Sequence, residues 1–173
     1  MNKAFFLDRD GTINVDYGYV HDINRWQFCS GAIEALKLIK AHGYLSIVVT
    51  NQSGIGRGMY TIHDMQLLHE QVNAMLAVEG ASIDAFYYCP HLPSDDCCCR
   101  KPRLGMYRKA IADFSIDPIL SVAIGDKLFD IERVGKLGVT RTSLIGNKFL
   151  SVLVLNSTCF ETLLEATQHW LKK

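Results

Sequence analysis

Two acidic residues separated by a single position, Asp8 and Asp10, follow an apolar run at residues 4–7. If that run is a strand, successive side chains face opposite sides, so both carboxylates can point into one crevice while Arg9 points the other way. Such a pair can bind a hard cation, and one carboxylate can act as a nucleophile while the other transfers a proton. The alternative is an acidic turn that ends a buried strand, because Asp and Gly are common turn residues.

A second acidic pair, Asp126 and Asp130, lies where the pattern changes from an apolar strand to a helix. We expect Asp126 to bind a metal ion directly and Asp130 to reach it through water or to orient a ligand. Magnesium is the expected ion, because it prefers a few carboxylate oxygens together with waters and substrate phosphate. The alternative for Asp126 is a helix cap.

Three further residues could bind phosphate groups. Thr50 offers a hydroxyl at the end of an apolar strand, and Lys101 offers a positive charge. Phosphoryl transfer needs such donors around the equatorial oxygens, together with an in-line nucleophile. Arg57, in the glycine-rich stretch 54–58, could bind a second anionic group of the substrate. The alternatives are an ordinary turn for Thr50, a flexible turn for the glycines, and a solvated basic loop at residues 100–102.

Four of the six cysteines lie between residues 89 and 99, together with a histidine. The spacing Cys-x-His followed by Cys-x-Cys supplies four soft ligands for tetrahedral zinc without an open position: Cys89, His91, Cys97 and Cys99. Such a closed site is structural. Within the zinc loop 89–102 it would hold residues 92–96 in place and so fix Arg100 and Lys101. Cys98 is then a spare thiol. The alternative is a set of unrelated reduced cysteines.

The 173 residues carry 18 basic and 18 acidic side chains, so the formal net charge is zero. This balance argues against a nucleic-acid-binding surface, which needs an excess of positive charge. We expect neither a signal peptide nor a membrane span of roughly 20 apolar residues, and therefore a cytoplasmic protein. The length fits one domain over residues 1–173, and we expect Cys29 and Cys159 to be small buried hydrophobic residues.

Helical and strand patterns alternate along the chain. Helices are predicted from a cap at Ser30 to Gly43, from Thr61 to Gly80, over 104–114, from Asp126 to Lys136, and over 160–171. Strands after the first are predicted over 45–49, 83–88, 119–124, 139–145 and 152–155. The inward positions of the first two helices are predicted to be Ala32, Leu36 and Ile39, and Met65, Leu68, Val72 and Met75.

This alternation predicts an α/β fold with a mostly parallel sheet and helices on both faces. Ligands of such sheets bind beyond the carboxyl ends of the strands. Several candidate residues each follow a predicted strand: Asp8 and Asp10, Thr50, Cys89 and Asp126. We therefore expect one site at that edge of the sheet. The loops are too short to hold a separate cap domain.

The motifs resemble those of haloacid dehalogenase superfamily phosphatases, in particular the branch of heptose-bisphosphate and histidinol-phosphate phosphatases. The matching segments are 8–12, 50–54, 89–91 with 97–102, and 125–126, within residues 4 to about 138. Segments 13–21 and 54–60 favour the heptose-bisphosphate members. The short spacer between His91 and Cys97 is similar to that of the histidinol-phosphate members, and the resemblance fades beyond Gly138.

The resemblance implies a Rossmann-like sheet without a large cap, and magnesium-dependent hydrolysis of the 7-phosphate of a heptose 1,7-bisphosphate in nucleotide-heptose synthesis for lipopolysaccharide or another surface glycan. Asp8 would form an aspartyl-phosphate, Asp10 would be the general acid and base, and Thr50 and Lys101 would stabilise the phosphoryl group. Magnesium would be bound by Asp8, the carbonyl of Asp10 and Asp126, and structural zinc by the four Cys and His ligands. The residues implied in substrate binding are Asp16, Tyr17, Gly18, Tyr19, Asn51, Gln52, Ser53, Arg57, Arg100 and Lys127.

Three other functions fit part of the pattern. A histidinol-phosphate phosphatase, or another small phosphomonoester phosphatase, would use the same chemistry on a different substrate. A zinc-ribbon module that binds nucleic acid would leave Asp8 and Asp10 unexplained. A phospho-receiver, which keeps its aspartyl-phosphate as a signal, needs neither the zinc loop nor the paired acids. We therefore expect a monomeric enzyme for a small phosphorylated sugar, with no nucleic-acid or membrane partner.

Overall fold

The computed structural model describes residues 1–146 and 157–172. Within these residues, six strands form one sheet in the order β3-β2-β1-β4-β5-β6, and all neighbouring strands are parallel. The strands are β1 (Ala4–Leu7), β2 (Leu45–Asn51), β3 (Ala85–Cys89), β4 (Val122–Gly125), β5 (Arg141–Ile145) and β6 (Thr158–Phe160). Because β1 lies between β2 and β4, the segment that contains Asp8 and Asp10 leaves the sheet at its middle, where parallel sheets bind ligands.

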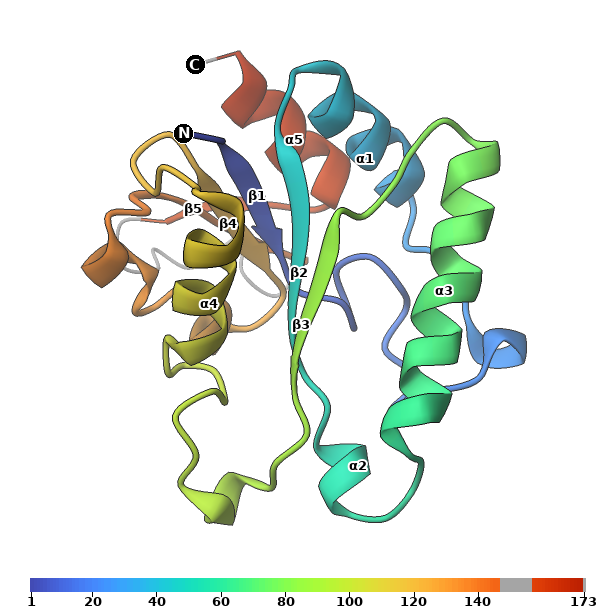
Figure 1. Ribbon diagram of the computed structural model, residues 1–173. Coiled ribbons are helices and arrows are strands. Elements are labelled where there is room, and N and C mark those ends of the chain that lie inside the picture. Colours follow the sequence, from blue (N-terminus) through green and yellow to red (C-terminus); the bar gives the residue numbers. More distant parts are fainter. Residues whose placement is uncertain (147–156, 173) are drawn as a thin grey trace.

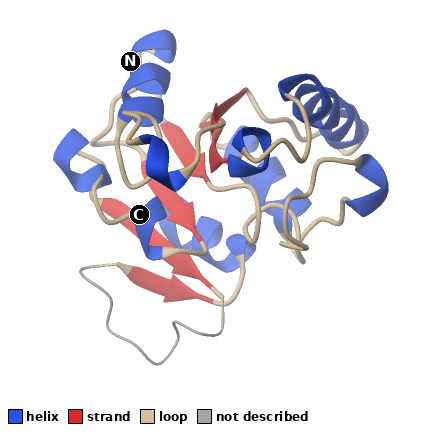
Figure 2. Cartoon of the chain, turned by 90° about the horizontal axis from the view of Figure 1, so that it is seen from below, coloured by secondary structure: helices blue, strands red, loops and turns tan. Residues whose placement is uncertain are grey.

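Helices cover both faces of the sheet, as predicted. On one face lie α1 (Ala32–Ala41), α3 (Ile62–Val78) and α5 (Leu163–Leu171), and on the other lies α4 (Gly105–Phe114). Figure 1 shows α4 on one side of the strands and α1 with α3 on the other, and Figure 2 shows helices on both sides of the sheet from below. The shorter elements are α2 (Ser53–Gly56) and 3-10 helices at Ile23–Arg25, Pro93–Asp95, Leu128–Asp130 and Val134–Leu137.

Alternate residues of β1 enter two separate hydrophobic cores. Phe5 and Leu7 pack with residues of α1, α3 and α5, whereas Ala4 and Phe6 pack with residues of α4. All four side chains are buried, because the strand lies between two layers of helices. The residues that follow β1 therefore start from a rigid, fully packed strand.

The described residues contain no cap domain over the carboxyl edge of the sheet, as predicted. Between 1 and 146 and between 157 and 172, no helix combines the length and the apolar character that a bilayer-crossing segment needs. Cys29 and Cys159 are partly buried rather than fully buried.

Two details of the first two helices differ from prediction. Gly31, not Ser30, directly precedes α1, and no side chain caps that helix. In α3 the inward residue is Leu76, which is buried, and not Met75, which is 46% exposed. A helix turns every 3.6 residues, so either residue continues the apolar stripe, and the packing of α3 on the sheet favours Leu76. Thr61 caps α3 as predicted, with Asp64 completing a capping box.

In the later part of the chain, the secondary structure differs more from the prediction. Two 3-10 helices, Leu128–Asp130 and Val134–Leu137, replace the predicted helix to Lys136. Phe160 belongs to β6, so the last helix begins at Leu163. Periodicity alone does not separate a short buried strand from a helix, which explains this error. The strand predicted over 152–155 lies outside the described residues.

Candidate active site

A cleft of about 300 Å³ lies at the carboxyl edge of the sheet. In Figure 1 this edge faces downward, toward α2 and the loop that follows β3. The loops after β1, β2, β3 and β4 all contribute to its walls. The lining residues are Asp8, Asp10, Asp16, Gly18, Tyr19, Thr50, Asn51, Gln52, Ser53, Tyr60, Arg100, Lys127 and Phe129. Most of the residues predicted for catalysis and substrate binding therefore meet in one place.

Lys101 is buried directly behind Asp8. Its Nζ lies 2.7 Å from Asp8 Oδ1 and 2.7 Å from Asp130 Oδ1, and it donates to the carbonyl of Val49 at 2.5 Å. Burial alone would lower the pKa of Lys101, but the carboxylates of Asp130 and Asp8 raise it above its usual value, so the ammonium stays charged. Burial raises the pKa of Asp130 to about 7 against the opposing effect of Lys101. Two carboxylates thus share one ammonium, which leaves negative charge for a cation to stabilise.

Asn51 holds the backbone of Lys101 in this position. Its Oδ1 accepts a hydrogen bond from the Lys101 N–H at 3.0 Å, and its Nδ2 donates to the Lys101 carbonyl at 3.2 Å. Asn51 ends β2, so this pair of bonds connects the sheet to the loop that follows β3. A side chain that the sequence indicates for substrate binding therefore also clamps the lysine.

The carboxylate of Asp10 accepts hydrogen bonds from three side chains. Arg9 donates from Nε at 3.1 Å and from Nη2 at 2.9 Å, Gln52 at 2.8 Å and Asn14 at 3.0 Å. The prediction that Arg9 points away from the acids is wrong for its guanidinium, because the long side chain bends back onto Asp10. Burial raises the pKa of Asp10, but the charge of Arg9 and these hydrogen bonds hold it below its usual value.

Gln52 connects Asp10 to Thr50. Its Nε2 donates to Asp10 Oδ2 and to Thr50 Oγ1, both at 2.8 Å, and its Oε1 accepts from the Tyr60 hydroxyl at 2.6 Å. The amide of Gln52 is therefore engaged within the protein. Because Thr50 Oγ1 accepts from Gln52, its own proton can be donated to a ligand in the cleft.

Asp8, Asp126 and Asp130 form a candidate metal group, in which one carboxylate oxygen of each lies within 4.8 Å of the others. Two glycines permit this approach. A Cβ on Gly11 would lie 2.5 Å from an Asp126 oxygen, and a Cβ on Gly125 would overlap Asp130. A set of carboxylate oxygens next to an open cleft fits magnesium, which keeps waters and substrate phosphate among its ligands.

The loop after β1 contributes Asp16, Gly18 and Tyr19 to the cleft. Gly18 and Tyr19 have φ angles of 73° and 51°, and the Gly18 N–H donates to the Asp16 carboxylate at 3.0 Å. Lys127 Nζ lies 3.0 Å from Asp126 and 3.5 Å from Asp16, so it connects this loop to the end of β4.

Two predicted substrate residues, Tyr17 and Arg57, do not line the cleft. The hydroxyl of Tyr17 donates to Gln27, and the residue is 52% exposed. The guanidinium carbon of Arg57 lies 6.0 Å from the centre of the Tyr19 ring, so Arg57 supports a residue of the cleft from outside.

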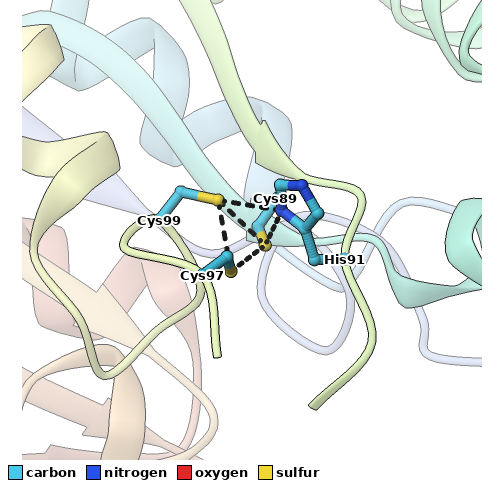
Figure 3. A group of neighbouring side chains, drawn as sticks. All are labelled: Cys89, His91, Cys97 and Cys99. Carbon is cyan, nitrogen blue, oxygen red and sulfur yellow. Dashed lines mark hydrogen bonds between the residues drawn. The ribbon is translucent and has the colours of Figure 1, made fainter. Parts of the chain in front are cut away.

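The four predicted zinc ligands converge beside the loop after β3. Figure 3 shows the thiols of Cys89, Cys97 and Cys99 and the imidazole of His91 pointing toward one another. The sulfur atoms are 3.2–3.5 Å apart, and His91 Nδ1 lies 3.3 Å from Cys99 and 3.5 Å from Cys89. Around tetrahedral zinc, with bonds of about 2.3 Å to sulfur, the ligand sulfurs lie about 3.8 Å apart, so a small outward shift of these side chains would accommodate zinc. Cys98 is exposed and outside the group, as its spacing predicts.

Two residues of the cleft, Tyr60 and Phe129, were not predicted from the sequence. Tyr60 stacks on His21 with ring centres 4.7 Å apart, and a Cβ on Gly54 would overlap the Tyr60 ring. The ring centre of Phe129 lies 5.8 Å from Lys101 Nζ. Isolated aromatic residues carry no functional signal in a sequence. Only their neighbourhood, next to the glycine-rich stretch and to Asp126, could have indicated them.

Known proteins share this sequence and this arrangement. A family model described as polynucleotide kinase 3 phosphatase matches residues 3–129. The D-glycero-beta-D-manno-heptose-1,7-bisphosphate 7-phosphatase of Haemophilus influenzae is 46% identical over 138 residues, which cover 76% of this chain and 75% of the relative. The protein of the same name from Pasteurella multocida is 49% identical over 137 residues, which cover 76% and 74%.

A solved structure resembles the chain over almost its whole length. The D,D-heptose 1.7-bisphosphate phosphatase from B. bronchiseptica, complexed with magnesium and phosphate, has a TM-score of 0.88 and 30% sequence identity, and the match covers 98% of each chain. The level of identity, its coverage and the shared fold agree with the motifs that meet in the cleft. The chain belongs to the D-glycero-D-manno-heptose 1,7-bisphosphate 7-phosphatases of the haloacid dehalogenase superfamily.

Proposed function

We propose that the protein hydrolyses the 7-phosphate of D-glycero-D-manno-heptose 1,7-bisphosphate in heptose biosynthesis, and that Asp8 is the nucleophile. The observation that carries this proposal is the carboxylate of Asp8, which lines the cleft while Lys101 holds one of its oxygens. The other oxygen is the attacking atom. The names of the relatives support the substrate and specify the beta anomer, which is the anomer we propose here.

The reaction takes two steps. First, Asp8 attacks phosphorus, the bond between phosphorus and the sugar oxygen breaks, and Asp10 gives that oxygen a proton. In the free protein the pKa of Asp10 lies below its usual value, so Asp10 takes up this proton only when the negative charge of the bound phosphate raises that pKa. Second, Asp10 takes a proton from a water molecule whose oxygen attacks the aspartyl-phosphate, and the phosphorus–oxygen bond to Asp8 breaks. Heptose 1-phosphate and inorganic phosphate are released, and both carboxyl groups return to their initial states.

Two residues stabilise the charge of the phosphoryl group during transfer. Thr50 donates its hydroxyl proton, which the hydrogen bond from Gln52 leaves available. Lys101 acts through its charge, because its ammonium already donates to Asp8 and to the carbonyl of Val49 and lies 2.7 Å from Asp130.

The residues present fit magnesium, which would be held by the carboxylates of Asp8 and Asp126 and by the carbonyl of Asp10. When bound, the ion neutralises charge on the phosphate and on the attacking carboxylate. Carboxylate oxygens of Asp8 and Asp126 lie within 4.8 Å of each other, so an ion at this place would be close to both. The relative from B. bronchiseptica, solved with magnesium and phosphate, supports this assignment.

The rest of the cleft is assigned to the sugar and its 1-phosphate. Arg100 and Lys127 are its partly exposed cations and suit a phosphate group. Asp16 suits sugar hydroxyls, and Gly18, Tyr19 and Ser53 complete the wall. Asn51 and Gln52 position their neighbours, and Tyr17 and Arg57 act through the loop rather than through direct contact.

The Cys and His cluster is assigned to structural zinc. Four mutually contacting ligands leave no open position for substrate or water. The ion would hold the loop 89–102 so that Arg100 and Lys101 reach the cleft. We also propose a cytoplasmic monomer, and light scattering at assay concentration tests the monomer.

Steady-state kinetics of Asp8→Asn test the nucleophile, with Glu70→Gln, an exposed carboxylate of α3, as the matched control. We expect Asp8→Asn to lose activity by at least about a thousandfold while the protein stays folded, and the control to keep both its activity and its fold. Wild-type protein is assayed on both anomers of the heptose bisphosphate and on histidinol phosphate, with zinc and magnesium content measured on the same preparation. Near-wild-type turnover by Asp8→Asn would contradict the assignment of Asp8 as the nucleophile. Hydrolysis of histidinol phosphate faster than that of the heptose bisphosphate would contradict the assignment of the substrate.

A further inference from the structure

The guanidinium of Arg9 is fully buried and makes four hydrogen bonds. Nε and Nη2 donate to the two oxygens of Asp10 at 3.1 and 2.9 Å, and Nη2 also donates to the carbonyl of Val20 at 2.6 Å. Nη1 donates to His69 Nε2 at 3.2 Å. Because a guanidinium is planar and its donors form a rigid fork, these bonds fix the orientation of the Asp10 carboxylate.

Of the described donors to Asp10, Arg9 alone holds both carboxylate oxygens. Asn14 donates only to Oδ1, and Gln52 only to Oδ2. A single hydrogen bond to one oxygen leaves the carboxylate free to rotate about its bond to Cβ, whereas a two-point contact sets its plane. Arg9 therefore sets the plane of the Asp10 carboxylate with a single rigid group, whereas Asn14 and Gln52 can do so only together.

His69 in turn fixes Arg9. Arg9 has only donors, so the nitrogen of His69 that faces it must accept, and the imidazole must be neutral. Burial lowers the pKa of His69 to about 3, and the charge of Arg9 adds to this effect. The ring stacks on Phe86 of β3, with centres 4.0 Å apart and planes at 11°, so it has a defined orientation.

We infer that Arg9 and His69 are positioning residues for Asp10: the stacked imidazole orients the guanidinium, and the guanidinium aims the carboxylate at the leaving oxygen. The inference rests on the proposed role of Asp10 as general acid and base. Arg9 also donates to the carbonyl of Val20, which directly follows the cleft-lining residues Gly18 and Tyr19. The same guanidinium thus ties the substrate loop to the residue that protonates the leaving group.

Two substitutions of His69 test this arrangement against a purely structural one. In His69→Gln the amide oxygen can take the place of Nε2 and keep the acceptor for Arg9, whereas in His69→Asn it can take only the place of Nδ1. The readout is kcat/KM for the heptose bisphosphate and for 4-nitrophenyl phosphate, whose phenolate leaves without needing a proton. We expect His69→Asn to lose about 10- to 100-fold on the sugar bisphosphate and less than about threefold on the aryl ester.

We expect His69→Gln to stay within about threefold of wild type on both substrates. The matched control is His63→Asn, which changes an exposed histidine of the same helix. Equal losses on the two substrates would mean that His69 matters only for packing, and unchanged kinetics of His69→Asn would also overturn the inference. If His69→Asn does not fold, Arg9→Lys tests the inference instead. This variant keeps the positive charge but removes the two-point contact of the guanidinium with Asp10. It must show the same selective loss of kcat/KM on the sugar bisphosphate.

Asp10→Asn, measured in parallel, separates this inference from the proposed function. If Asp10→Asn loses kcat/KM selectively on the sugar bisphosphate while His69→Asn and Arg9→Lys do not, that result would contradict only the positioning roles of His69 and Arg9. A loss in Asp10→Asn that is equal on both substrates would remove the assignment of Asp10 as the acid.

Discussion

The carboxylate group and the cysteine cluster lie at the same edge of the sheet, yet they are built in opposite ways. The cluster draws its four ligands from residues 89–99, and these ligands contact one another. The carboxylate group joins residues after β1 to residues after β4, more than a hundred positions later, and opens into the cleft. Soft ligands in a closed set retain an ion, whereas hard ligands beside a cleft allow exchange with water and substrate.

Lys101 connects the two sites. It lies two positions after the last cysteine of the cluster, and its ammonium contacts Asp8 and Asp130. A zinc ion in the closed cluster would therefore serve the open site by fixing the loop that carries a buried positive charge. The comparison predicts that changes to the open site remove activity without removing zinc, and that changes to the cluster affect both.

The largest effect is expected from brief treatment with a chelator. Because magnesium would exchange through the cleft, activity should fall at least about a thousandfold and return when magnesium is added. Zinc content should stay at one ion per chain and the melting temperature should not change, since the closed site releases its ion slowly. Zinc that leaves as fast as activity falls, or activity restored by zinc alone, would contradict the difference between the sites.

Lys101→Met is expected to have the next largest effect. It removes the only described cation between Asp8 and Asp130 and leaves two buried carboxylates facing each other. We expect kcat to fall by about 100- to 1,000-fold and the free energy of unfolding to fall by about 3–5 kcal/mol. The control is Lys109→Met, whose side chain is 67% exposed and pairs with Asp113 on the surface. Zinc content should stay unchanged in both variants, and loss of zinc from Lys101→Met would show that the two sites are not separable.

The same contrast explains which parts of the molecule the sequence predicts. The zinc ligands can be predicted from the sequence because they are close together in it. The parallel sheet can be predicted because strand and helix patterns alternate. The contacts of Arg9, Asn51 and Gln52 cannot be predicted from the sequence, because each depends on the conformation of a long side chain or on a partner that only the fold brings near. Asn51 clamps a backbone fifty positions away, and Gln52 reaches Asp10 across 42 positions.

The errors in secondary structure have a related cause. Met75 and Leu76 both fit an apolar helical stripe, and only the packing of α3 makes Leu76 the buried one. Phe160 belongs to β6, a three-residue strand at the edge of the sheet. Such a short apolar run shows neither the period of a strand nor that of a helix. Local patterns thus predict elements and motifs, while tertiary contacts decide which side chains face the site.

Cys97→Ser should affect both sites, and Cys98→Ser is its matched control in the neighbouring position. We expect Cys97→Ser to lose zinc, to lower the melting temperature by about 10 °C, equivalent to about 3 kcal/mol, and to reduce kcat by about 10- to 100-fold because Lys101 loses its support. Cys98 is exposed and outside the cluster, so Cys98→Ser should keep all three properties. A Cys97→Ser protein that loses zinc but keeps full activity would show that the loop holds Lys101 without the ion.

The smallest effect is expected from Asn51→Ala, which removes the clamp between β2 and Lys101 and leaves both metal groups intact. Two hydrogen bonds to the Lys101 backbone are lost, and at about 0.7 kcal/mol each their loss should reduce kcat by about tenfold while zinc content stays at one ion per chain. Asn24→Ala, at an exposed position, serves as the control. Because the zinc cluster holds the same loop, Asn51→Ala and Cys97→Ser should cost more together than the sum of their separate effects on the free energy of the transition state. Simple additivity would mean that the clamp and the cluster position Lys101 independently, and the cluster would then be a stabilising element with no share in building the open site.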